Sequence, residues 1–178
     1  NDNVSKHARD CGTCTMCCKV LGIPELKKPR GDWCEHCDIG KGCKIYDQRP
    51  KVCRGFNCEY ILDPDFPEEW KPNNSRMVVV RENSAITVHV DPNMPSIWRD
   101  APYFMNFKRW ATDLENEKGS VFIYIGARVI VILPDKEIDL GVIADDETIL
   151  MSQKVSSSGI VRDAVKIKKN DPRAKIIE

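Results

Sequence analysis

All nine cysteines of this 178-residue chain lie between residues 11 and 58, and the 120 residues that follow contain none. Thiols packed this densely need something to hold them, because neighbouring thiolates oxidise and exchange. A disulfide framework, a metal ion, an iron–sulfur cluster or a redox relay would each do so. The first third of the chain is therefore expected to fold around sulfur chemistry. The nine residues are Cys11, Cys14, Cys17, Cys18, Cys34, Cys37, Cys43, Cys53 and Cys58.

A disulfide framework is the weakest of these interpretations. An odd number of cysteines cannot pair completely, and the adjacent Cys17 and Cys18 would strain the peptide between them if they formed a bridge. Bridges here would also leave two thirds of the chain without a cross-link. The polar N-terminus, NDNVSKHARD, has no apolar stretch of the secretion-signal kind. We therefore expect a reducing compartment, the cytoplasm.

The spacing of the cysteines indicates metal binding. Three thiols follow one another at two-residue gaps from Cys11 to Cys17, and Cys34-x-x-Cys37 forms a second knuckle with Cys43 six residues further on. Short loops of this kind wrap around one centre, and glycines within them permit the positive φ angles that tight turns require. Two such clusters so close together are far more specific than a single C-x-x-C.

The residues leave the identity of the metal open. Zinc favours a closed tetrahedron of four thiolates, or of three thiolates and an imidazole such as that of His36. A C-x2-C-x2-C run with a remote fourth cysteine and a nearby proline is the bacterial ferredoxin arrangement for a [4Fe–4S] cluster, and Cys53, after Pro50, would be that fourth ligand. Thiolates are soft ligands that suit both. We expect Zn²⁺ and a [4Fe–4S] cluster equally.

Two blocks of the chain resemble a known family. The run Cys11-Gly-Thr-Cys14-Thr-Met-Cys17-Cys18 and the block GCKIYDQRPKVCRGF, residues 42–56, are similar to the signature of the zinc- or iron-chelating CxxCxxCC (YkgJ-like) cysteine-cluster proteins. Most members are uncharacterised bacterial proteins of the cytoplasm. The same signature occurs in flagellin lysine methylases, where the cysteines look like iron–sulfur ligands. This chain is much shorter than those enzymes, so the resemblance does not imply their activity.

The resemblance also implies which residues build the site. Arg49 and Arg54 would offset the negative charge of the gathered thiolates, because four thiolates on one Zn²⁺ leave a net charge of −2. Pro50 would fix the turn that presents Cys53. The family motif supports a ligand role for Cys58 less strongly than for the other cysteines. The implied ligands are Cys11, Cys14, Cys17, Cys18, Cys43 and Cys53 with one or both of Cys34 and Cys37, and the implied supporting residues are Tyr46, Arg49, Pro50, Arg54 and Phe56.

The rest of the chain predicts an α+β fold. Residues 77–81 and 85–90 are strand-like around a turn, and residues 121–125 and 128–133 are β-branched runs around Gly126-Ala127. Apolar residues from 104 to 114 follow helical spacing after Pro102, and Gly119 is expected to end that helix in the left-handed conformation. Further strands are expected at 138–143 and 148–151. We predict a small irregular metal-stabilised cysteine module (1–62), a mostly antiparallel sheet with one main helix (63–153) and a basic polar tail (154–178).

The net charge and the lengths of the apolar stretches limit the classes of function that the chain can have. The net charge is zero, so a nucleic-acid partner is not expected, and no apolar stretch is long enough to span a membrane. Apart from the cysteines, no acid–base or nucleophile motif occurs. We therefore predict a metal-binding protein with a non-catalytic role, as a chelator, a metal carrier or a metal-stabilised interaction module with room for a protein partner. The alternative is an iron–sulfur protein with a redox or modification-enzyme role.

Overall fold

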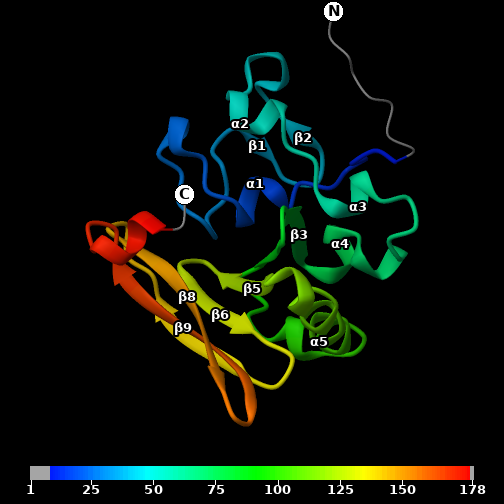
Figure 1. Ribbon diagram of the computed structural model, residues 1–178. Coiled ribbons are helices and arrows are strands. Elements are labelled where there is room, and N and C mark those ends of the chain that lie inside the picture. Colours follow the sequence, from blue (N-terminus) through cyan, green and yellow to red (C-terminus); the bar gives the residue numbers. More distant parts are fainter. Residues whose placement is uncertain (1–8, 177–178) are drawn as a thin grey trace, which may run out of the picture.

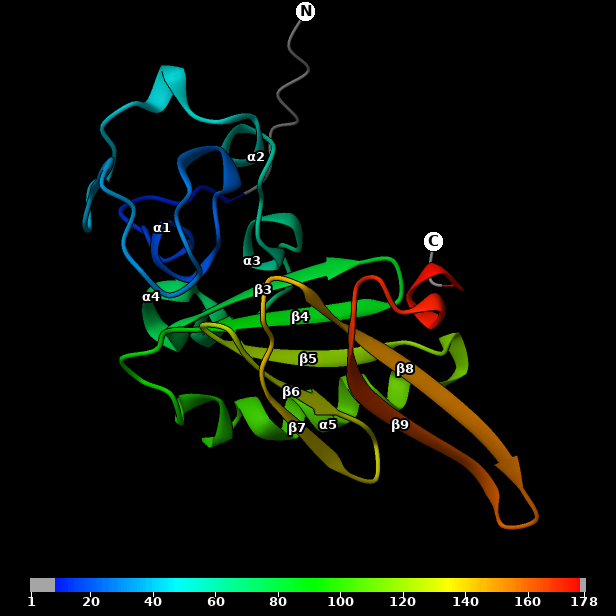
Figure 2. The ribbon, with the colours of Figure 1, turned by 90° about the vertical axis from the view of Figure 1, so that its left-hand side faces the viewer.

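The computed structural model describes residues 9–176 and has the mixed α+β fold that the sequence predicts. Its main sheet has five strands in the order β3-β4-β5-β6-β7, of which Figure 1 labels β3, β5 and β6 and Figure 2 labels all. Neighbouring strands run antiparallel except β4 and β5, which are parallel. A parallel pair needs a long crossover, and residues 91–119 supply it with the main helix, α5 (Tyr103–Asp113). The strands are β3 (Met77–Glu82), β4 (Ala85–Val90), β5 (Ser120–Ile125), β6 (Arg128–Ile132) and β7 (Glu137–Val142).

One face of this sheet packs on α5. The predicted apolar stripe of the helix is confirmed: Phe107, Trp110, Ala111 and Leu114 are buried and Phe104 is half-buried. Trp70, in the connector before β3, packs between the helix residues, with its ring centroid 5.5 Å from that of Phe107 and 5.0 Å from that of Trp110. The strand residues of this layer are Met77, Val79, Ile86, Val88, Val90, Val121, Ile123, Ile130 and Ile132.

The other face of the sheet is partly covered by a long hairpin, which lies across the sheet from α5 (Figure 2). It consists of β8 (Glu147–Ser156) and β9 (Gly159–Lys168), and it buries Ala164 against Val131 and Leu133. The prediction of a basic polar tail from residue 154 is therefore wrong for residues 154–168. Lysines and serines alternate there with apolar residues, and the chain buries only one face of the hairpin.

Gly119 has a different role from the predicted one. Helix α5 ends at Asp113, a 3₁₀ turn η5 (Glu115–Glu117) follows, and Lys118 rather than Gly119 takes the left-handed conformation, with φ 56°. Gly119 lies so close to the preceding hairpin that a Cβ atom there would stand 2.1 Å from the carbonyl oxygen of Ser84. The glycine is required because the backbone of the crossover passes tightly over the β3–β4 turn.

The cysteine-rich segment has very short regular elements and packs beside β3. Met16, Cys58 and Ile61 share the main core with Val78 of that strand. A buried carboxylate, Asp91, joins the two parts, because it pairs with Lys19 at 2.6 Å and also with Arg76. The elements of the cysteine-rich segment are α1 (Cys17–Val20), η1 (Pro24–Leu26), β1 (Cys37–Asp38), β2 (Gly42–Cys43), η2 (Tyr46–Gln48), α2 (Lys51–Arg54) and α3 (Glu59–Leu62). The connector that leads to β3 contains η3 (Glu68–Trp70) and α4 (Pro72–Ser75).

Two short turns complete the described chain: η4 (Ile97–Arg99) lies in the crossover before α5, and η6 (Pro172–Ile176) follows β9. Among residues 9–176, no helix combines the length and the apolar character that crossing a membrane requires. Most of the polar N-terminal stretch used in the sequence analysis, residues 1–8, lies outside the described residues.

Candidate metal centre

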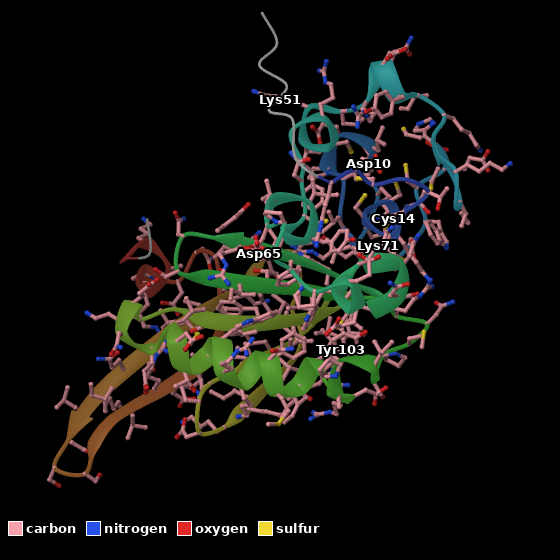
Figure 3. The ribbon with its side chains drawn as sticks, turned by 90° about the vertical axis from the view of Figure 1, so that its right-hand side faces the viewer. Asp10, Cys14, Lys51, Asp65, Lys71 and Tyr103 are labelled. Carbon is pink, nitrogen blue, oxygen red and sulfur yellow. The ribbon has the colours of Figure 1, made fainter. Side chains whose placement is uncertain are left out.

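One cavity of about 370 Å³ has all nine cysteines in its wall. Each of them is a free thiol, and no two are joined in a disulfide. Figure 3 shows the sulfur atoms gathered around Cys14, within the segment that packs above the sheet. The fold therefore brings every predicted ligand to one place, although 47 residues of sequence separate Cys11 from Cys58.

Short hydrogen-bonded turns position the thiols. The backbone N–H of Cys14 donates to the carbonyl oxygen of Cys11 at 2.9 Å, which closes the first knuckle. The N–H of Cys34 donates to the carbonyl of Cys18, and that of Cys37 to the carbonyl of Cys34, both at 3.0 Å. Cys43 lies opposite Cys37 in the β1–β2 pair. Backbone bonds of this kind place the second knuckle directly against helix α1.

The remaining two cysteines come from the elements that follow. Cys53 lies within α2, and Cys58 directly precedes α3. Pro50 stands immediately before α2, in the position the sequence analysis gave it, and the cavity wall includes it. A proline suits this position because the first turn of a helix leaves its N–H groups without partners.

The thiols fall into two packing groups. Cys34 and Cys37 are buried with Ile23, and Cys18 and Cys53 pack against them. Cys58 is buried in the main core, and Cys14 and Cys17 pack against that core instead. Sequence reasoning assigned the remote fourth ligand of the first run to Cys53. The structure places Cys58 beside that run, and Cys53 with the second knuckle.

The environment of the cavity disfavours the thiolate form of six of the nine cysteines, because it raises their pKa. Burial is the main cause that raises the pKa of Cys11, Cys14, Cys53 and Cys58. Burial and the nearby Cys18 raise the pKa of Cys37 to about 12. Several thiolates this close together repel one another, so a cation is needed before they can ionise at neutral pH.

Backbone N–H groups nevertheless point at two of the sulfurs. The Sγ of Cys14 accepts hydrogen bonds from the backbone of Met16 and Asn73, and that of Cys58 accepts them from Tyr60 and Ile61. Each of these bonds favours the thiolate, because an N–H donor stabilises negative charge on sulfur. Donors of this kind around the sulfur ligands also orient them in metal sites.

Lys28 is a supporting residue that sequence reasoning missed. Its ammonium is buried and donates to the carbonyl oxygens of Lys19, at 2.6 Å, and of Leu21, at the end of α1. Burial lowers the pKa of Lys28, while the nearby Cys34 and Cys18 act in the opposite direction. It thus brings positive charge to the thiols on α1 and on the second knuckle. No pattern in the surrounding sequence, LKKPRG, distinguishes Lys28 from the exposed Lys27.

The five predicted supporting residues take different positions. Arg49 lies over the Tyr46 ring, with its Cζ atom 3.6 Å from the ring centroid, and its Nε donates to the Tyr46 carbonyl oxygen. The positive charge of Arg49 favours the thiolate of Cys11. Phe56 lines the cavity, whereas Arg54 is exposed on α2 and does not line it. His36 also lines the cavity.

The chemistry of these donors fits a thiophilic metal, since soft thiolates select zinc, Cu(I) and iron–sulfur clusters. The positions of these donors do not form a complete ligand shell. Among residues 9–176, no three or more Cys, His, Asp or Glu side chains stand together as a ready-made ligand group. The cavity therefore gathers the donors without closing them around a point.

Comparison of the chain with protein-family models, with curated proteins and with solved structures gave no match. The resemblance to the cysteine-cluster family therefore depends on the motif in residues 11–56 alone.

Proposed function

We propose that this protein binds a thiolate-held metal centre through its N-terminal cysteines and serves as a chelator, a metal carrier or a metal-stabilised interaction module. The observation that carries this proposal is the convergence of all nine free thiols on one cavity. The motif shared with the zinc- or iron-chelating family supports it as well. A reducing compartment such as the bacterial cytoplasm belongs to the proposal, because nine free thiols would oxidise elsewhere.

The chain's own residues provide what such a centre needs. Nine thiols supply more donors than a tetrahedral site uses. Lys28 and Arg49 bring positive charge to the thiols, and backbone N–H groups aim at the sulfurs of Cys14 and Cys58. When bound, the centre would supply a strong cross-link between loops that have few regular elements of their own. Binding would release protons from the thiols and draw them together, so the free energy of binding becomes folding free energy.

The alternative is an iron–sulfur protein, because the soft thiolates that hold zinc hold iron–sulfur clusters as well. The C-x2-C-x2-C run from Cys11 to Cys17 supports it, since bacterial ferredoxins use that spacing. A redox or modification role would follow from that cofactor.

Metal analysis of the purified protein tests both forms of the proposal. The protein is purified without oxygen, and zinc, iron and acid-labile sulfide are measured per chain together with the visible spectrum. A colourless protein with about one or two zinc ions supports the chelator, and a brown protein with near-equal iron and sulfide supports the iron–sulfur alternative. A protein that carries no metal and takes up none after reduction would refute the proposal.

A second experiment asks whether the metal shapes the module. Removal of the metal with a strong chelator in the presence of a reductant is expected to expose residues 11–58 to protease while β3–β9 stay protected. Unchanged protection of residues 11–58 in the metal-free protein would show that these loops fold without a metal.

A further inference from the structure

A second cavity, of about 650 Å³, lies on the face of the sheet that is turned away from α5. Its volume is within the range of small-molecule sites. Strands β4 and β5 line one side of it, and the chain from the end of β7 into β8 lines the other, where the hairpin lies in front of the sheet (Figure 2). Arg30 of the cysteine-rich segment and Lys169 after β9 complete the lining. All nine cysteines lie in the described part of the chain, and none of them lines this cavity.

Arg30 is held in place beside the sheet. The N–H of the next residue, Gly31, donates to the carbonyl oxygen of Lys19 at 3.0 Å, and a Cβ atom on Gly31 would stand 2.8 Å from the ring of Pro92. The guanidinium of Arg30 lies over the Tyr124 ring, with its Cζ atom 4.6 Å from the centroid. This stacking uses one face of the guanidinium and leaves the N–H donors on its edge available. The structure gives them no carboxylate partner among residues 9–176.

The charged side chains of the lining leave an excess of positive charge. The carboxylate of Glu147 is already occupied, because it accepts the N–H of Ala144 at 2.9 Å and pairs with Lys168 at 3.5 Å. The other charged lining residues are Arg30, Lys169 and Asp145, and none of these three forms an ion pair within the described part of the chain. Two unpaired cations and one unpaired carboxylate therefore remain, so the cavity favours an anion.

The rest of the lining is largely apolar. Phe122 and Tyr124 on β5 and Ile149 and Met151 on β8 are half-buried there. Thr87 on β4 adds a hydroxyl group between them and the edge of the sheet. An apolar lining with a few convergent polar groups is the usual composition of a site for a small organic molecule.

We propose that this cavity binds a small organic acid, whose carboxylate or phosphate group lies on the guanidinium edge of Arg30 and whose apolar body packs on Phe122 and Met151. The planar fork of a guanidinium matches two oxygens of either acidic group at once. A neutral ligand would leave the donors of Arg30 without a charged acceptor, and a cationic ligand would be repelled by Arg30 and Lys169. The site does not depend on the proposed metal binding.

Four small probes test this assignment. Benzoate and phenyl phosphate carry the two acidic groups on the same apolar ring, benzamide is the neutral counterpart of benzoate, and acetate lacks the ring. Each probe is titrated into the reduced, ¹⁵N-labelled full chain, and the amide chemical shifts are followed by two-dimensional NMR. The spectrum also checks that each variant keeps its fold.

Three variants are compared with the unaltered chain. Arg30→Gln and Lys169→Gln each remove one cation from the lining. Arg54→Gln is the matched control, because Arg54 is an exposed arginine of the same cysteine-rich segment and lines neither cavity.

At least one of the two ring acids is expected to shift the amides of the lining residues on β4, β5 and β8, with a Kd on the order of 1 mM, and the tighter of the two identifies the preferred acidic group. Arg30→Gln is expected to weaken this binding at least about tenfold, and Lys169→Gln by a smaller factor. Arg54→Gln is expected to leave it unchanged. Benzamide and acetate are expected to bind at least about tenfold more weakly than benzoate.

Three results would overturn the proposal. The first is that neither ring acid shifts the lining amides at about 10 mM. The second is that benzamide or acetate binds as tightly as the ring acids, which would remove the acidic group or the apolar body from the site. The third is that Arg30→Gln binds the ring acids as the unaltered chain does.

Discussion

We predict that the buried His89, in the main sheet, makes the free energy of unfolding fall in acid, independently of the cysteines. The imidazole lies on β4, is only 7% exposed, and has no hydrogen-bond partner for its Nδ1 atom. Its ring stacks on Tyr124 with centroids 5.4 Å apart, and the guanidinium of Arg30 lies over the same tyrosine. Burial, with a contribution from the charge of Arg30, lowers the pKa of His89 from its ordinary 6.5 to about 3.

The sign and size of the effect follow from this shift. Between the ordinary pKa of 6.5 and the folded value of about 3, the unfolded chain binds a proton that the folded chain does not. The free energy of unfolding therefore falls as the pH drops through this window, by about 1.4 kcal/mol per pH unit for one such group. At about pH 5 the loss attributable to His89 is about 2 kcal/mol.

Replacement of the imidazole by an apolar side chain isolates this contribution. His89→Leu is compared with the unaltered protein by denaturant unfolding, followed by tryptophan fluorescence, from about pH 7 to about pH 5. The variant is expected to gain about 2 kcal/mol relative to the unaltered protein over this range, whatever its stability at neutral pH. Acid acts on the cysteines of both proteins alike, so their difference reports His89.

Thr87→Val is the matched control, because Thr87 lies two residues earlier on the same face of β4 and does not titrate. Its stability is expected to change with pH as that of the unaltered protein does. A difference between His89→Leu and the unaltered protein that stays constant with pH would refute the reasoning, since it would mean that the folded chain takes up the proton as readily as the unfolded one.

Three further substitutions test the contacts that hold the parts together. Asp91→Asn leaves the buried Lys19 without its anionic partner and is expected to cost about 3–5 kcal/mol in thermal or denaturant unfolding. Arg162→Met removes the hydrogen bonds to the carbonyl oxygens of residues 118 and 119 and should cost about 2 kcal/mol, with faster amide exchange in β8 and β9. Gly119→Ala places a methyl group against the Ser84 carbonyl and should cost at least about 2 kcal/mol, seen as a lower Tm.

Each of these has an outcome that would contradict it. An Asp91→Asn protein as stable as the parent would show that the ion pair contributes little. Unchanged amide exchange in Arg162→Met would show that the hydrogen bonds of Arg162 do not stabilise the hairpin. Gly55→Ala is the control for Gly119→Ala, because its new methyl group would be no closer than 3.7 Å to any neighbour. Equal effects of the two glycine changes would argue against the close approach at residue 119.

Local sequence patterns predicted the elements whose structure depends only on their own residues. The β-branched runs on either side of Gly126 and the helical spacing from Phe104 to Leu114 predicted the strands and the helix, and the structure confirms both. The parallel pairing of β4 with β5 was not predicted, because it depends on residues 35 positions apart. The β9 strand was missed because Lys166 and Lys168 suggested a solvated tail.

For the candidate site, the spacing of the cysteines predicted that they gather, but it did not predict which cysteines lie next to one another. The cysteine pattern pointed to all nine thiols, and the structure places all of them on one cavity. Nothing in the spacing could associate Cys58 with Cys14, because their proximity depends on how residues 19–57 loop back. Lys28 was also missed, since burial of a lysine by carbonyl oxygens depends on the fold and leaves no local signature.

The β8–β9 hairpin has a consequence for how the chain can be made. Val131 and Leu133 are shielded on one side by residues that leave the ribosome only after the rest of the sheet is complete. Until then the nascent sheet exposes apolar surface to the cell. A polypeptide terminated before about residue 147 would leave that apolar surface permanently exposed. Such truncated products should be found in aggregates or bound to chaperones, even though all nine cysteines would already be in place.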